Sequence, residues 1–90
     1  MSQIKYLLDE LDKIISLETT QPLEKLGGYI VGELLGDYEG KYSGLYDSNA
    51  KVQRIGDLAS DLEISNGNPD QLQAMWIEIK QLVGEIKQDI

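Results

Sequence analysis

The apolar residues near the C-terminus recur at spacings of three and four, and they predict an amphipathic helix from Pro69 to about Asp89. Asn68 can cap its first turn, and Pro69 suits the first helical position because an N–H there would have no partner within the helix. Ile77 lies off the apolar face, where it either meets a second neighbouring helix or stays exposed, and packing is the simpler interpretation. The predicted core-facing stripe consists of Leu72, Met75, Trp76, Ile79, Leu82, Val83, Ile86 and Ile90.

Three further segments carry the same helical period, and they run from about Gln3 to Leu17, from Pro22 to Leu35, and from Ser48 or Asn49 to Glu63. The period-two pattern of a strand is absent from the sequence. Four amphipathic helices with short connections predict an all-α fold, an antiparallel bundle of about four helices, in one domain over residues 1–90. The predicted buried faces of the first three helices are Ile4, Leu7, Leu8, Leu11, Ile14 and Ile15; Leu23, Leu26, Ile30, Val31, Leu34 and Leu35; and Val52, Ile55, Leu58, Ala59 and Leu62.

The second of these helices contains three glycines, Gly27, Gly28 and Gly32. Each costs up to about 1 kcal/mol relative to alanine in a helix interior. A glycine kept in such a place usually allows a neighbouring element to approach closely. We therefore expect a packing reason for these residues.

The stretch from Gly36 to Asn49 fits two interpretations. Glycines at 36, 40 and 44 alternate with tyrosines at 38, 42 and 46, and this spacing of four suits a helix that continues the one before it. The composition suits a glycine-rich loop. We favour a loop that contains a helical turn, with Asp47 or Ser48 as the cap of the helix that follows.

The composition excludes several classes of function. The chain of 90 residues has 16 acidic and 8 basic side chains, a formal net charge of −8, which argues against binding to nucleic-acid phosphates or anionic lipid. Neither a signal-peptide pattern nor an apolar run of membrane-spanning length is present, so we expect a cytoplasmic protein.

Nothing in the sequence predicts catalysis or a cofactor. The absence of cysteine removes disulfides and thiolate metal sites, and the absence of histidine removes the most common general base and metal ligand. The carboxylates do not have the spacing of an EF-hand, and the glycines form neither a P-loop nor a dinucleotide-binding motif. We expect a protein that is not an enzyme, that has no metal site and that needs no cofactor.

Two acidic stretches lack nearby basic residues. One lies between Arg54 and Lys80, and the other lies between Lys25 and Lys41. They form either a surface that steers a cationic partner or a solvated face that keeps the protein soluble. The tyrosines have the same two interpretations, because tyrosine is enriched at protein interfaces but also packs over the ends of bundles. The candidate partner-binding residues are Glu33, Asp37, Tyr38, Glu39, Tyr42, Tyr46, Asp47, Asp57, Asp61 and Glu63.

Unpaired acids such as Asp57, Asp61 and Glu63, beside tyrosines such as Tyr42 and Tyr46, occur here in a short all-helical pattern without cysteine. In these features the chain resembles the small acidic immunity proteins that accompany colicin-type nucleases and contact-dependent growth inhibition toxins. The resemblance implies that an acidic surface covers the active site of a basic toxin nuclease. The alternative is a regulatory or scaffolding helical module, an adaptor or small homodimer that docks through apolar helix surface.

Overall fold

The computed structural model describes residues 3–35, 42–64 and 68–89, and every regular element within these residues is helical. The all-α prediction is confirmed. The antiparallel bundle of about four helices is not confirmed, because a short fifth α-helix lies between the second and third predicted helices. In chain order the elements are α1 (Gln3–Ser16), the 3-10 turn η1 (Leu17–Thr19), α2 (Leu23–Leu35), α3 (Ser43–Ser48), α4 (Ala50–Ile64) and α5 (Pro69–Asp89).

The predicted apolar stripes meet in one core. Trp76 is 1% exposed and lies among leucine, isoleucine and valine side chains from the other helices, as its place in the stripe predicted. Ile77 is 45% exposed, so the expectation that it packs against a second helix is wrong. Its position about 100° around the helix from Trp76 turns it away from the core. The fully buried members of the core include Leu7, Leu11, Leu26, Ile30, Leu34, Val52, Ile55, Leu62, Ile79 and Ile86.

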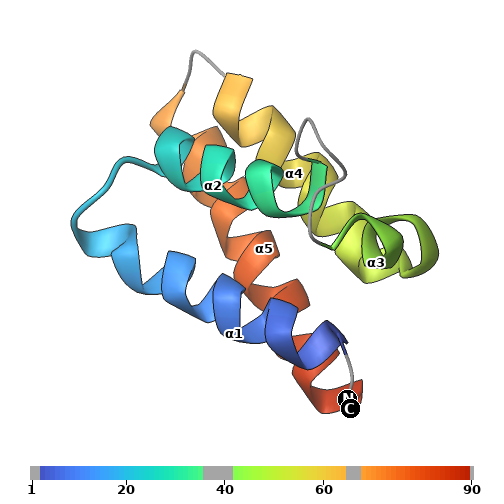
Figure 1. The fold of residues 1–90 in the computed structure, drawn as a ribbon. Coiled ribbons are helices and arrows are strands. Elements are labelled where there is room, and N and C mark those ends of the chain that lie inside the picture. The colour runs from blue at the N-terminus through green and yellow to red at the C-terminus, as the bar shows by residue number, and fades with distance from the viewer. Residues whose placement is uncertain (1–2, 36–41, 65–67, 90) are drawn as a thin grey trace.

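The most extensive helix–helix contact joins α2 to α4, which cross near the top of Figure 1. Gly27 is buried at this contact, and a Cβ there would lie 2.8 Å from the carbonyl oxygen of Ala59 and 3.1 Å from the backbone nitrogen of Glu63. The expected packing reason is therefore confirmed for Gly27. It does not hold for Gly32, since a Cβ there would meet nothing within 4 Å.

The second half of the tyrosine-rich stretch forms the helix α3, which agrees with the expected helical turn, while residues 36–41 lie outside the described part of the chain. Asn49 ends α3 and also caps α4. Its backbone N–H donates to the carbonyl of Leu45, and its side-chain oxygen accepts the N–H groups of Lys51 and Val52. Asn49 is extended (φ −118°, ψ 116°), as a capping residue must be. The prediction that Asp47 or Ser48 caps α4 is therefore wrong, because the capping residue is Asn49.

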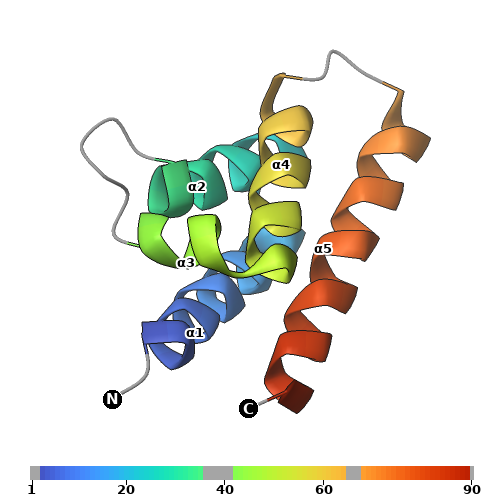
Figure 2. The same cartoon turned by 90° about the vertical axis from the view of Figure 1, so that its right-hand side faces the viewer.

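Helix α5 runs antiparallel to α4 along one side of the molecule (Figure 2). Asn68 caps it by accepting the N–H of Asp70, and Pro69 is its first residue, both as predicted. The radius of gyration, 12.2 Å, matches the value of about 12 Å expected for a compact chain of this length. None of the helices in residues 3–35, 42–64 and 68–89 is both long and apolar enough to cross a membrane.

Candidate functional site

The structure separates the candidate partner-binding residues into distinct groups. Asp37, Tyr38 and Glu39 lie outside the described residues. Tyr42 is 3% exposed and belongs to the hydrophobic core, and its backbone N–H donates to the carbonyl of Glu33 at 3.2 Å. This bond ties the start of α3 to the last turn of α2 and places the Tyr42 ring inside the fold. The ring is therefore not available as the surface anchor that the sequence suggested.

Tyr46 and Asp57 come together where α3 meets α4. The Tyr46 hydroxyl donates to the Asp57 carboxylate with an O–O distance of 2.7 Å. Gly56 provides the space for this contact, since a Cβ there would lie 2.6 Å from the tyrosine ring. The hydrogen bond to Asp57 raises the pKa of Tyr46, and the charges of Asp57 and Asp47 raise it further. The raised pKa agrees with the role of the Tyr46 hydroxyl as a hydrogen-bond donor to Asp57.

Asp61 lies one helical turn beyond Asp57 on the exposed side of α4. Arg54 lies seven residues before Asp61 on α4, and its guanidinium binds Glu78 of α5 at 2.9 Å. This bond is the main reason that the pKa of Arg54 is raised, and the charges of Asp57 and Asp61 add to the effect. Asp61 itself forms no ion pair with another described residue. We call Asp47, Asp57 and Asp61 the α3–α4 acidic surface.

Glu63 and Glu33 do not belong to that surface. Glu63 lies on the α2 side of α4, because a Cβ at Gly28 would be 3.3 Å from its carboxylate. Glu33 lies on α2 and faces α1. The predicted acidic residues that the structure describes thus form two groups, one at the α3–α4 junction and one beside α2.

The ion pairs of the described residues gather around α5 and α1. Lys51 and Arg54 of α4 reach Asp89 and Glu78 of α5, at 2.7 and 2.9 Å. In the opposite direction, lysines of α5 reach η1 and α1, since Lys80 pairs with Glu18 and Lys87 pairs with Asp12. By contrast, the acidic side chains of α2, α3 and α4 form no ion pair with any residue in the described ranges; they are Glu24, Glu33, Asp47, Asp57, Asp61 and Glu63.

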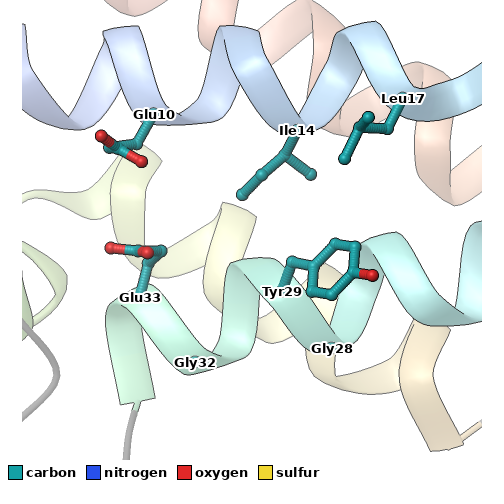
Figure 3. Close-up of a pocket in the computed structure, with 7 residues that line it drawn as sticks. All are labelled: Glu10, Ile14, Leu17, Gly28, Tyr29, Gly32 and Glu33. Carbon is teal, nitrogen blue, oxygen red and sulfur yellow. The ribbon is translucent and has the colours of Figure 1, made fainter.

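An open groove of about 570 Å³ lies between α1 and α2, and it was not predicted from the sequence. The two helices run in opposite directions along it, as Figure 3 shows. Its apolar part is formed by partly exposed side chains, with Tyr29 at 40% and Leu17 at 38% exposed. The lining residues, which define what we call the α1–α2 groove, are Glu10, Ile14, Leu17, Gly28, Tyr29, Gly32 and Glu33.

A signal for the groove was present in the sequence but was ambiguous. Gly28 and Gly32 are four residues apart, so they lie on the same side of α2 and leave that side without bulk. The same spacing also fits close packing of another helix, and close packing was the expectation from the sequence. The position of α1 decides whether this side of α2 is covered by close packing or left as an open groove.

Comparison of the chain with protein-family models, with curated proteins and with solved structures found no match. The function has to be inferred from the surface itself. Exposed carboxylates without cationic partners attract cations and basic proteins, while an open apolar groove can accept the side chains of another protein. Both features favour binding to a protein.

Proposed function

We propose that the protein binds and neutralises a basic toxin nuclease by covering the active site of the toxin. In this proposal the protein acts as an immunity protein in the cytoplasm, without catalytic activity of its own and without a cofactor. The contact is made through the α3–α4 acidic surface and through Glu33 and Glu63 beside α2. Tyr46 contributes contact area between the carboxylates, whereas the buried Tyr42 is no longer part of the proposed contact.

The observation that carries the proposal is the segregation of charge. The cations of α4 and α5 are engaged in ion pairs along α5. Most of the described acids without such pairs lie on α2, α3 and α4, and the exceptions are Asp9 on α1 and Asp70 on α5. A protein that needed charge only for solubility could distribute it over the whole surface. Negative charge without neighbouring cations accelerates encounter with a positively charged partner and suppresses binding to acidic ones.

The alternative, a regulatory or scaffolding module, is favoured by a different observation. Ile77 of α5 and the α1–α2 groove both expose apolar surface that another helix could cover. Binding by such a module depends on apolar contact, so it would tolerate salt and would not require a basic partner.

The structure defines the variants that test the acidic surface with least damage to the fold. Replacing Asp57 by Asn removes the charge but keeps an acceptor for the Tyr46 hydroxyl. Asp61→Lys reverses a charge that has no described ion-pair partner. We expect the free energy of unfolding of the double variant Asp57→Asn, Asp61→Lys to lie within about 0.5–1 kcal/mol of the parent.

The experiment is affinity capture from the native host, followed by identification of the bound protein and assay of its nuclease activity. We expect the parent to capture a basic protein and to inhibit it stoichiometrically, and the double variant to bind it at least about tenfold more weakly at low salt. The matched control is Asp9→Asn, Asp70→Lys, which makes the same charge change on α1 and α5. Capture of an acidic or neutral partner, or equal loss in both variants, would contradict the proposal.

A further inference from the structure

The α1–α2 groove has two chemically different ends. Glu10 of α1 and Glu33 of α2 lie at one end, and their side chains face each other across it in Figure 3. Ile14 lies between them and the apolar end, where Leu17 and Tyr29 line the walls. Gly32 lines the groove and faces open space, because a Cβ added there would meet nothing within 4 Å.

The charge around the groove is negative and largely uncompensated. Glu33 forms no ion pair among the described residues. Glu10 has one contact at 3.5 Å, with Lys13 on its own helix, and the Lys13 side chain is 74% exposed. Glu63 lies close to the groove, since its carboxylate approaches Gly28. An occupant that brings a positive charge to the Glu10–Glu33 end would be complementary, and an acidic one would be repelled.

The walls of the groove restrict the backbone of the occupant. The walls are α2 and α1, and α1 is continued by Leu17 of η1. Their central N–H and C=O groups are already bonded within the helices, so an extended peptide would find no strand edge to pair with. A helix satisfies its own backbone and offers side chains at intervals of three and four residues. From Glu10 to Leu17 the groove extends for about two helical turns, about 10 Å, which suits three successive positions on one face of a helix.

We propose that the α1–α2 groove holds an amphipathic helix of the basic partner. A Lys or Arg of this helix lies between Glu10 and Glu33, and its apolar side chains pack against Ile14, Leu17 and Tyr29. This inference rests on the proposed function, since the occupant belongs to the same cationic protein. The sequence suggested Tyr42 as a surface anchor, but this residue is buried. In the present proposal the apolar part of the groove, next to the candidate acidic residue Glu33, takes that role.

A second copy of this chain is a poor occupant by comparison. Each copy has a net charge of −8, and Lys5 and Lys25 are the cations in the described residues that form no ion pair. Docking one copy into the groove of another would bring two acidic surfaces together. Self-association is therefore an outcome that would contradict the inference.

The test uses a synthetic amphipathic helical peptide of leucine and lysine as the probe, titrated into isotope-labelled protein and followed by amide NMR shifts. We expect the shifts to concentrate on residues 10–17 and 28–33. A scrambled peptide of the same composition, which has no apolar face, controls for charge, and a peptide with glutamate in place of lysine controls for apolarity. Both should bind at least about tenfold more weakly than the amphipathic lysine peptide.

Two pairs of variants locate the binding. Gly32→Leu fills the groove and should weaken peptide binding at least about tenfold, whereas Gly84→Leu is the matched control. A Cβ at Gly84 also meets nothing within 4 Å, but Gly84 lies on α5, away from the groove. Glu33→Gln should weaken binding and reduce its salt dependence, while Asp9→Asn on the exposed side of α1 should do neither.

The same variants separate the groove from the proposed function. If the captured partner is lost with Asp61→Lys but retained with Gly32→Leu, the acidic surface binds a basic protein and the groove inference is wrong. If shifts spread over α3 and α4 and Gly32→Leu binds the peptide normally, the inference is also wrong. Loss of the captured partner with Gly32→Leu, and not with Gly84→Leu, supports it.

Discussion

Gly27 and Gly32 show how the same residue type serves opposite purposes within one helix. Gly27 lets the backbone of α2 approach that of α4, because a Cβ at this position would lie only 2.8 Å from the carbonyl oxygen of Ala59. Gly32 faces open space and leaves the α1–α2 groove accessible. One glycine therefore serves the stability of the fold, and the other, in our proposal, serves binding.

Alanine at these two positions should change stability in opposite directions. Gly27→Ala forces α2 away from the α4 backbone and should lower the free energy of unfolding by about 1–3 kcal/mol. Gly32→Ala adds a methyl group to open space in a helix and should raise it by about 0.5–1 kcal/mol. Urea unfolding curves of the two variants measure both effects. Destabilisation by Gly32→Ala, or a neutral Gly27→Ala, would show that the α2 environment is not as described.

For single residues, burial could be predicted wherever it follows from the helical repeat of apolar positions. Leu11, Ile55 and Ile79 lie at the centre of their stripes, and all three are fully buried. Tyr42 was not predictable, because its burial depends on a bond to the end of α2 and not on a helical period. The pairing of Tyr46 with Asp57 was equally hidden, since the two residues are 11 positions apart and meet only when α3 packs on α4.

Among the elements, the turn η1 is held to α5 by one carboxylate. Glu18 accepts a hydrogen bond from the indole N–H of Trp76 at 2.5 Å, and it also pairs with Lys80 at 3.2 Å. The bond from Trp76 is the largest cause of a lowered pKa at Glu18, followed by the bond from Lys80. The charged carboxylate is thus stabilised by folding, and it links the loop after α1 to the middle of α5.

This link should give the protein a stability that is lost in acid. Because the pKa of Glu18 is lower in the folded protein than its ordinary 4.5, the contribution is complete above that pH and disappears as pH falls through the folded pKa. Glu18→Gln keeps an acceptor for the indole but removes the charge. At neutral pH we expect the variant to be less stable by about 1 kcal/mol or less, the usual range for an exposed pair.

The measurement is the melting temperature of the parent and of Glu18→Gln from neutral pH to about pH 3, with Trp76 fluorescence as a local probe. The difference between the two proteins should shrink steadily as the pH falls below 4.5. A difference of the same size at every pH would mean that the charge of Glu18 does not stabilise the fold.

The bounds of the long helices were predictable to within about one or two residues, because stripes, Asn68 and Pro69 mark them. The residue that caps α4 could not be predicted from the sequence. Asp47, Ser48 and Asn49 can all cap a helix, and the sequence does not show that α3 extends to Ser48 and leaves Asn49 as the first extended residue. The turn η1 was not predicted either, because it has no helical repeat of apolar residues of its own. Its residues were assigned to the end of the first helix and to the connection after it.

For the whole molecule, the net charge was evident from composition, but its distribution was not. The sequence showed acidic stretches without nearby lysine or arginine, and it could not show which cations fold back onto them. Arg54 and Lys51 turn towards α5, which leaves the α3–α4 acidic surface without an ion pair among the described residues. The α1–α2 groove depends on the distance between two helices, which no local pattern encodes.

If an uncompensated acidic surface recruits a basic protein, the binding must weaken as salt screens the charges. Exposed charges interact over about 10 Å at 0.1 M salt and over about 3 Å at 1 M. We therefore expect the affinity for the captured partner to fall at least about tenfold between about 0.05 and 0.5 M sodium chloride, mainly through slower association. An affinity that stays constant across this range would contradict the account, and would favour an apolar scaffolding module instead.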